Sequence, residues 1–394
     1  MVSAYNSDHL EKKERIKLGS FYTPEKLVKK VYSYVMPYIK KNKEKTVIFD
    51  SAAGGGAFIL GLEEVDYRVA DWDEKAFKSL KNNFKNSKVF YTNSLKNVKR
   101  SKYDIEQDNF LIIVGNPPYN DTTSKYKNGE KGDNICDDDL FDRDLGRSFL
   151  RSYNKLNADV VCVLHPLSYL IKKTNFRRLK DFKDNYKLVN GTIFSSSLFS
   201  ETSSTEFPIM IGLYERDKDG MTFNDIKNFN FSVLESQKKF KLSDYETIDD
   251  FIRKYPPRKN DMQESPIDLY YYTLRDINSL KRNKSFMDEK HYNGIVVTVE
   301  NFYQYAYLYA FKKLFNPEKS WLYGNLTPLV NKNKLKKNKK KYVEYAIQDN
   351  TTLKSLERNT IKEITDYYDL SLNNLTPISE LESFIKDELN LLTK

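Results

Sequence analysis

Short strand-like runs alternate with helical segments through the first half of the chain, and this alternation limits the possible folds most. The runs are rich in β-branched residues, too short for helices, and cover 46–50, 67–73, 89–92, 111–114 and 160–164. Strands that alternate with helices form parallel βαβ units. The sequence therefore predicts a doubly wound, mostly parallel Rossmann-like α/β sheet, whose ligands bind at the carboxyl ends of the strands.

This alternation stops in the second half of the chain. A last strand is expected over 205–214, and a charged turn follows at 215–220. We place a domain boundary in that turn, which predicts two domains, residues 1–217 and residues 218–394. The second should be a mixed α+β domain, because short strand-like and helical segments are mixed in it and the pattern is helical from Leu353 onward.

The chain is basic, which favours polyanionic partners. Lys and Arg number 65 against 55 Asp and Glu, giving a net charge of +10. Seven lysines fall between Lys332 and Lys341 without an acid among them, which suits phosphate contacts as well as a simple solvated segment. Of the 29 Tyr and 24 Phe some must form the core, and a surplus suits stacking on bases.

The sequence gives no indication of a metal site or of a membrane-spanning segment. The two cysteines, Cys136 and Cys162, indicate neither a disulfide framework nor a zinc site, and the three histidines are scattered. We interpret His165, beside a proline at a strand end, as a packed residue, and the acids at 137–139 as part of a solvated loop over 120–143. No apolar run approaches the roughly 18 residues of a membrane span, so we expect a cytoplasmic protein without metal.

A rigid loop follows the fourth expected strand. Strand 111–114 ends at a glycine and continues into Asn-Pro-Pro-Tyr at 116–119. The prolines fix their own φ angles, and Pro117 keeps Asn116 out of the helical region. Because ligands bind at this edge of an α/β sheet, the loop should turn the Asn116 amide and the Tyr119 ring outward. An ordinary turn at the end of a strand would have the same sequence pattern, so other parts of the chain are needed to distinguish it from a ligand-binding loop.

A glycine-rich turn follows the first expected strand. Strand 46–50 ends at Asp50 and leads into 51–60, which contains three glycines before an expected helix. Small residues let the backbone approach a ligand closely, and a helix N-terminus offers free N–H donors. About 20 residues later a strand ends in Asp71, the spacing typical of a carboxylate that binds a ribose. Such a turn by itself is a weak indicator of a nucleotide site.

The segment before the first strand is expected to form a helix. Thr23 should cap it, Pro24 should occupy its first position, and Glu25 supplies an early acid. Apolar residues then recur at helical spacing up to Val35, and Pro37 should end the helix.

These motifs occur in the order of a known enzyme family. The segments that carry the resemblance are Phe21–Pro24, Asp50–Phe58, Asp71 and Asn116–Tyr119. Together they resemble the γ-class of S-adenosylmethionine-dependent DNA adenine-N6 methyltransferases, the restriction-modification type with an Asn-Pro-Pro-Tyr motif. The resemblance covers residues 18–215. It implies that the first domain is catalytic and binds S-adenosylmethionine, and that the second is a target-recognition domain that binds double-stranded DNA.

The resemblance also implies a cofactor site. Tyr22 and Thr23 would close over the methionine part of the cofactor, Asp50 would hold its methionine end, and Asp71 its ribose. Asn93 stands where the family usually has an Asp that binds the adenine amino group, and an amide oxygen could replace that carboxylate less strongly. The expected cofactor-binding residues are Tyr22, Thr23, Asp50, Ala52, Gly54, Gly56, Asp71, Trp72, Asn93 and Asn116.

The reaction that the resemblance implies takes place at the Asn116 loop. An adenine N6 amine is a poor nucleophile because its lone pair is delocalised into the ring. The Asn116 side-chain oxygen and the Pro117 carbonyl would each accept a hydrogen bond from one of its N–H groups and so free the lone pair, and no strong base is needed. The base must be flipped out of the duplex, to stack between Tyr119 and Phe199, with Phe194 as the second choice. The expected catalytic residues are Asn116, Pro117, Pro118 and Tyr119.

Three other functions fit parts of the sequence. Protein glutamine methyltransferases also carry Asn-Pro-Pro-Tyr, RNA adenine methylation uses similar chemistry, and a non-catalytic nucleic-acid-binding subunit could keep the fold with a decayed cofactor site. The Thr-Pro motif ahead of the glycine turn, and the long segment after the catalytic core, favour DNA. A lone recognition domain fits a monomer that reads an asymmetric site, with a cognate restriction endonuclease as a possible partner.

Overall fold

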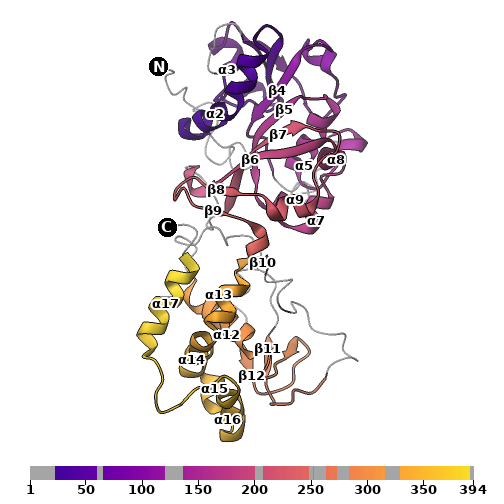
Figure 1. Ribbon diagram of the computed structural model, residues 1–394. Helices are drawn as coiled ribbons and strands as arrows, with labels where there is room; N and C mark the ends of the chain where they lie inside the picture. The colour runs from indigo at the N-terminus through magenta and orange to yellow at the C-terminus, as the bar shows by residue number, and fades with distance from the viewer. Residues whose placement is uncertain are drawn as a thin grey trace. The chain divides into compact units, whose positions relative to one another are not determined.

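The computed structural model describes residues 23–59, 65–119, 136–199, 207–247, 252, 263–272, 284–315 and 329–390 (Figure 1). The chain forms two compact units that divide between Phe240 and Lys241. No helix in the described ranges is long and apolar enough to cross a membrane. Tyr22, one of the predicted cofactor residues, lies outside the described residues.

The first unit is built on a nine-stranded sheet in the order β3-β2-β1-β4-β5-β7-β6-β8-β9. Strands β1 to β5 pair in parallel, whereas β7 runs antiparallel between β5 and β6. The predicted fold class, a doubly wound and mostly parallel α/β sheet, is confirmed. The strands are β1 (Thr46–Asp50), β2 (Asp66–Asp71), β3 (Lys88–Tyr91), β4 (Phe110–Gly115), β5 (Val160–Pro166), β6 (Tyr186–Ser195), β7 (Pro208–Arg216), β8 (Phe231–Val233) and β9 (Lys239–Phe240).

Helices cover both faces of this sheet, which explains why its central strands are apolar throughout. Figure 1 shows α2 and α3 on one side of the sheet and α5 with α8 on the other. Residues Leu111–Val114 of β4 are almost completely buried, as expected for a strand covered on both faces. The helices are α2 (Glu25–Lys41), α3 (Glu74–Asn83), α5 (Leu145–Lys155), α6 (Ser168–Ile171), α7 (Lys173–Arg177), α8 (Asp181–Asn185) and α9 (Phe223–Asn228).

Both ends of helix α2 differ from the prediction. Pro24 occupies the N-cap position, and no side chain caps the helix, so the Thr23 hydroxyl is not used as a cap. The helix also continues past Pro37 to Lys41. A proline inside a helix removes one hydrogen bond, but Ile39, in the turn that follows Pro37, is buried with only 4% of its surface exposed. Burial of that last turn offsets the free-energy cost of the hydrogen bond that Pro37 removes.

The domain boundary also lies later than the charged turn suggested. Beyond residue 217 the chain adds α9, β8 and β9 to the first unit, and β8 pairs in parallel with β6. Strand β6 itself was not predicted, and Phe194, the second choice for stacking on the base, is a fully buried residue of this strand. Polar turns connect strands within a domain as often as they separate domains, so composition alone could not distinguish the two cases.

The second unit mixes helices with two small antiparallel sheets, as expected for an α+β domain. Strand β10 (Glu246–Thr247) pairs with β14 (Leu329–Val330), and the other sheet has the order β12-β11-β13. The strands of that sheet are β11 (Tyr270–Tyr272), β12 (Phe286–Met287) and β13 (Gly294–Val296). The helices are α12 (Phe302–Leu314), α13 (Lys332–Lys337), α14 (Lys339–Asp349), α15 (Thr351–Ser355), α16 (Arg358–Tyr367) and α17 (Ile378–Asn390).

Aromatic side chains form the core of the second unit. Tyr305, Tyr307 and Tyr309 of α12 are all buried, and the ring of Tyr271 packs edge-to-face on Phe286 and against Tyr305. The sequence had suggested that part of the aromatic surplus serves to stack on bases. These tyrosines do not, because their rings fill the interior between α12, α14 and the β11 sheet.

Candidate active site

Three polar side chains lie at the same edge of the sheet. Strands β2, β1 and β4 are neighbours and run in parallel. Asp71 is the last residue of β2, Asp50 is the last of β1, and Asn116 directly follows β4. Because the carboxyl ends of parallel strands lie together, the structure places the predicted acids and the predicted loop side by side.

The glycine-rich turn folds back onto β2. The Ala53 amide donates to the Ala70 carbonyl at 3.0 Å, and the Gly54 amide donates to Asp71 Oδ2 at 2.8 Å. Gly56 has φ +81°, and a β-carbon there would lie 2.4 Å from the Phe84 ring, so only glycine fits. The helix expected straight after the turn is absent from the described residues up to Ile59, because the positive φ angles of Gly54 and Gly56 interrupt helical geometry.

Asp50 is a buried carboxylate without a cationic partner among the described residues. Its Oδ1 accepts the Ala52 amide at 3.1 Å. Gly115 packs against it so closely that a β-carbon there would lie 2.8 Å from the same oxygen. Burial raises the pKa of Asp50 to about 7, although the Ala52 hydrogen bond lowers it, and the nearby charge of Asp71 raises it further. Such a carboxylate would gain from a bound cationic group.

Asp71 holds the turn and the start of α3. Its two oxygens accept amides from Gly54 and Asp73, each at 2.8 Å. Burial raises the pKa of Asp71, while these amide hydrogen bonds lower it. Each carboxylate oxygen keeps a second lone pair, so the side chain can still accept from a ligand hydroxyl. The neighbouring Trp72, one of the expected cofactor-binding residues, is 56% exposed, which leaves its ring available to a ligand.

The Asn93 side chain is already engaged in a local turn. Its Oδ1 accepts the Leu95 amide at 2.9 Å, and its backbone carbonyl accepts Lys102 Nζ at 2.7 Å. The amide oxygen that was predicted to bind the cofactor adenine therefore shares its acceptor capacity with the backbone. The role of Asn93 stays a prediction.

The Asn116 loop contacts the start of α2. Asn116 Nδ2 donates to Thr23 Oγ1 at 3.3 Å, which joins two predicted motifs that lie 93 residues apart. Asn116 Oδ1 is buried and has no hydrogen-bond partner in the described part of the chain. A buried amide oxygen without a donor is costly, so an unpaired one indicates a place where a ligand donor can bind. Pro117 is buried, and Pro118 is half-buried.

Tyr119 lies differently from the prediction. Its hydroxyl is buried and, within the described residues, unpaired, whereas the sequence predicted a ring turned outward. The β-carbon of Tyr119 packs at the first turn of α5, where a β-carbon on Gly146 would lie 3.1 Å from Tyr119 Cβ and 2.5 Å from the Tyr169 hydroxyl. The absence of a side chain at Gly146 leaves room for the tyrosine. Burial, and then the charge of Asp144, raise the pKa of Tyr119.

The predicted second stacking residue is part of the core. Phe199 is 2% exposed, and its ring meets that of Phe194 edge-to-face with centroids 5.9 Å apart. Both candidates are therefore buried in this conformation. Stacking of Phe199 on a base stays a prediction.

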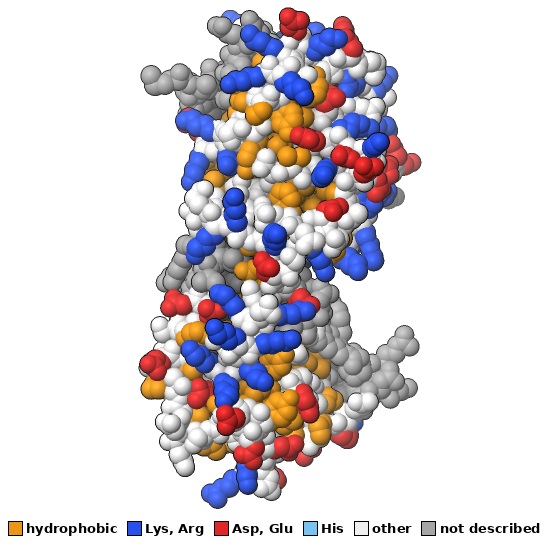
Figure 2. Space-filling model, viewed as in Figure 1, with side chains coloured by type: hydrophobic (Ala, Val, Ile, Leu, Met, Phe, Trp, Pro, Cys, Tyr) orange, Lys and Arg blue, Asp and Glu red, His pale blue; other side chains and the backbone are white. Residues whose placement is uncertain are grey.

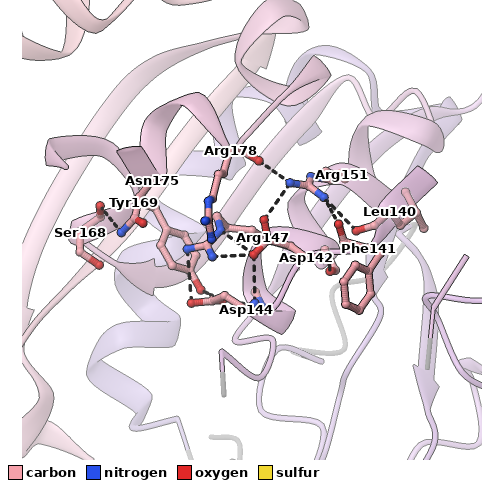
Figure 3. Close-up of polar contacts among 12 residues, drawn as sticks. Leu140, Phe141, Asp142, Asp144, Arg147, Arg151, Ser168, Tyr169, Asn175 and Arg178 are labelled. Carbon is pink, nitrogen blue, oxygen red and sulfur yellow. Dashed lines mark hydrogen bonds and ion pairs between the residues drawn. The ribbon is translucent and has the colours of Figure 1, made fainter. Parts of the chain in front are cut away.

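Sequence reasoning missed a buried charged cluster at the start of α5 (Figure 3). Arg147 Nη2 and Arg151 Nη2 bind opposite oxygens of Asp142, at 2.5 and 2.9 Å. Asp144 caps α5 through the Gly146 amide and also accepts the Tyr169 hydroxyl. The signal that could have found the cluster is two arginines four residues apart in a helix, preceded by two acids.

The remaining titratable candidates are structural. His165 Nε2 bonds to the Tyr214 hydroxyl at 2.6 Å, its ring stacks on Tyr169, and burial lowers its pKa to about 4, which confirms the interpretation as a packed residue. Asp137 accepts the Asn97 amide, and Asp139 pairs with Lys155. Within the described ranges no three His, Cys, Asp or Glu residues converge as metal ligands do. Of the expected loop at 120–143, residues 120–135 lie outside the described chain, whereas Asp142 is buried rather than solvated.

Comparison with known proteins agrees with this geometry. A family model described as N-6 DNA Methylase matches residues 7–175, a range that contains Thr23, both acids, the Asn116 loop and α5. No protein of curated function matches the chain. Residues 7–175 are thus similar to N-6 DNA methylases.

Solved structures with a similar fold come from several methyltransferases. The type IIG restriction endonuclease BpuSI is 17% identical, covers 57% of this chain and 28% of its own, and has a TM-score of 0.41. A candidate class I S-adenosylmethionine-dependent methyltransferase from Listeria monocytogenes is 13% identical over 59% of this chain and 76% of its own, with a TM-score of 0.40. A candidate RNA methyltransferase from Pyrococcus horikoshii is 17% identical over 51% of this chain and 89% of its own, with a TM-score of 0.34. These likenesses concern the fold alone.

Proposed function

We propose that the chain transfers a methyl group from S-adenosylmethionine to the N6 amino group of a flipped-out adenine in double-stranded DNA. One observation carries this proposal: the oxygen of Asn116, at the carboxyl end of β4, is buried and has no hydrogen-bond partner among the residues that the structure describes. It lies at the sheet edge where Asp50 and Asp71 end the two neighbouring strands. The match of residues 7–175 to N-6 DNA methylases supports the same reaction.

The residues at the sheet edge suit S-adenosylmethionine. The cofactor carries an ammonium and a sulfonium group, and a buried carboxylate whose pKa is raised to about 7 would be stabilised by a cation nearby. Asp71 can accept from ribose hydroxyls at its remaining lone pairs, and the exposed Trp72 can cover the adenine. Thr23, held by Asn116, would lie over the methionine part. The bound cofactor would supply an electrophilic methyl group.

Asn116 would bind and orient the amino group. Its Oδ1 and the Pro117 carbonyl would each accept a hydrogen bond from one N–H of the amino group, which would leave the nitrogen lone pair free to point toward the methyl group that the cofactor would supply. The oxygen is already fixed by the Thr23 contact of the same side chain, so little reorganisation is needed. Tyr119 would stack on the flipped base.

Methyl transfer to unmethylated genomic DNA tests the proposal. The chain is incubated with labelled S-adenosylmethionine and DNA, and the digested nucleosides are separated by mass. We expect N6-methyladenine. Label in RNA, or in a glutamine of an added protein, would mean that the substrate class is different. Absence of S-adenosylmethionine binding would indicate a non-catalytic nucleic-acid-binding subunit instead.

The second unit would supply DNA contacts through its lysine-rich segment. Figure 2 shows Lys and Arg side chains gathered on the visible face of this unit. Within the segment, Lys332, Lys334 and Lys340 pair with acids. Lys336 and Lys337 are exposed and have no ion-pair partner in the part of the chain that is described. Unpaired lysines in such a run are suited to phosphates.

Removing these two charges should weaken DNA binding in a salt-dependent way. For Lys336→Gln/Lys337→Gln we expect the slope of log affinity against log salt concentration to decrease by roughly 2, because each phosphate contact contributes about 0.9. The matched control is Lys354→Gln/Lys362→Gln, which removes two exposed lysines from α15 and α16. Fluorescence anisotropy with a duplex measures both. Equal slopes for the two variants would contradict a phosphate-binding role for α13.

A further inference from the structure

The Tyr119 hydroxyl is a buried donor without an acceptor within the described residues. Its position is set by α5, since the Tyr119 β-carbon and the Tyr169 hydroxyl both pack at the space left by Gly146. A buried hydroxyl without an acceptor costs free energy, about 1–3 kcal/mol for a group of this kind. The hydroxyl is therefore expected to find an acceptor in at least one functional state of the protein.

Asp144 is the nearby group with acceptor capacity to spare. Its Oδ1 accepts two hydrogen bonds, from the Gly146 amide at 3.0 Å and from the Tyr169 hydroxyl. Its Oδ2 faces Arg147 Nη1 at 3.6 Å, which is an ion pair but too long for a good hydrogen bond. One carboxylate oxygen thus retains free lone pairs beside a tyrosine that lacks an acceptor.

The carboxylate of Asp144 is also held firmly. It is the N-cap of α5, and Arg147, which faces it, is bound in turn by Asp142 through Nη2 at 2.5 Å and Nε at 3.1 Å. Figure 3 shows Asp144 enclosed between Tyr169 and Arg147. A group fixed from several sides can orient a neighbour, whereas a mobile one cannot.

We propose that Asp144 is the positioning residue for Tyr119, accepting a hydrogen bond from its hydroxyl and thereby holding the ring where it stacks on the target base. This inference rests on the proposed function. Tyr119 Cβ packs at Gly146, whose amide Asp144 binds, and the pair would pre-organise the base site before DNA binds. Asp144 itself does not touch the base.

A double-mutant cycle with Tyr119→Phe and Asp144→Asn tests the proposal. We expect each single variant to lower kcat for duplex methylation about tenfold, with unchanged cofactor affinity, and the double variant to be no worse than either. Fluorescence of 2-aminopurine at the target position should show the same loss of base stacking in all three. The free energy of unfolding of the cofactor-free chain, measured by denaturant titration, provides a second cycle that needs no activity.

The control pairs Asp144→Asn with Tyr153→Phe. Tyr153 is a buried tyrosine of the same helix whose hydroxyl bonds to Ser51, about 13 Å along α5 from Asp144. These two changes should be additive. Additivity between Asp144 and Tyr119 in kcat would overturn the proposal, even if the unfolding cycle showed coupling. If the wild-type chain does not methylate DNA, the proposed function fails, and absence of coupling in unfolding would overturn the positioning role separately.

Discussion

Replacing Asn116 by alanine is expected to lower the rate of methyl transfer by about 10²–10³-fold, because one positioned hydrogen-bond acceptor of the reacting group is lost. Affinity for S-adenosylmethionine should change little, since the Asp50 and Asp71 carboxylates remain in place. The structure gives the reason for this separation. The Asn116 oxygen has no hydrogen-bond partner in the described ranges and would be available to the base, whereas its amide nitrogen is bound to Thr23. Single-turnover kinetics and calorimetric titration of the cofactor measure the two quantities.

Asn154→Ala is the matched control for this change. Asn154 lies in α5 and also has a buried side-chain oxygen without a partner among the described residues, but it is not at the sheet edge. Its replacement should leave the transfer rate close to that of the wild type. Parallel loss of cofactor binding in Asn116→Ala, or an equal loss of rate in Asn154→Ala, would contradict the role assigned to Asn116.

Asp50→Asn is expected to have opposite effects on binding and on stability. The asparagine cannot carry the negative charge that a cationic cofactor group would meet, so we expect a loss of S-adenosylmethionine affinity on the order of 100-fold, about 2.7 kcal/mol. The cofactor-free protein should become more stable above pH 7, by up to about 4 kcal/mol, because a buried carboxylate with a pKa of about 7 no longer has to ionise. Asparagine keeps an oxygen for the Ala52 amide.

The stability of the chain and its cofactor affinity should both depend on pH, because the pKa of Asp50 is raised in the folded state. The folded-state pKa of Asp50 is raised from 3.8 to about 7, so the folded chain binds the proton more tightly than the unfolded chain does. The contribution of Asp50 to stability is therefore fully present below about pH 4, and is lost as the pH rises to about 7. Cofactor affinity should change in the opposite direction, rising with pH and levelling off above about 7. Both dependences should be absent in Asp50→Asn.

Asp142→Asn provides the contrast, because Asp142 is a buried carboxylate that has partners. Burial alone would raise the pKa of Asp142, but hydrogen bonds and charges from Arg147 and Arg151 hold it below the usual range. Its removal should therefore destabilise the chain at neutral pH, and this contribution is lost as the pH falls through the lowered pKa. Denaturant unfolding at pH 5 and pH 8 compares the two variants. A destabilised Asp50→Asn at pH 8 would contradict the account of Asp50.

Local chemistry was sufficient to predict the sheet edge that carries the candidate site. Strand β4 is a run of β-branched residues, and the prolines that follow it exclude helix whatever surrounds them. The acids at the ends of β1 and β2, and the glycines of the turn, also depend on short-range steric rules. These features were visible because each is encoded within about ten residues.

Other features depended on partners far away in the chain. Thr23 bonds to Asn116 rather than capping α2, and strand β6 is defined by its pairing with β7 and β8. The Tyr119 β-carbon packs at Gly146 of α5, where a larger residue would leave too little room. The sequence by itself determined the fold class and the positions of Asp50, Asp71 and Asn116 at one edge. Only the tertiary structure decided which polar atoms are satisfied and which remain unpaired, because a buried group is stabilised or left costly by neighbours that periodicity does not specify.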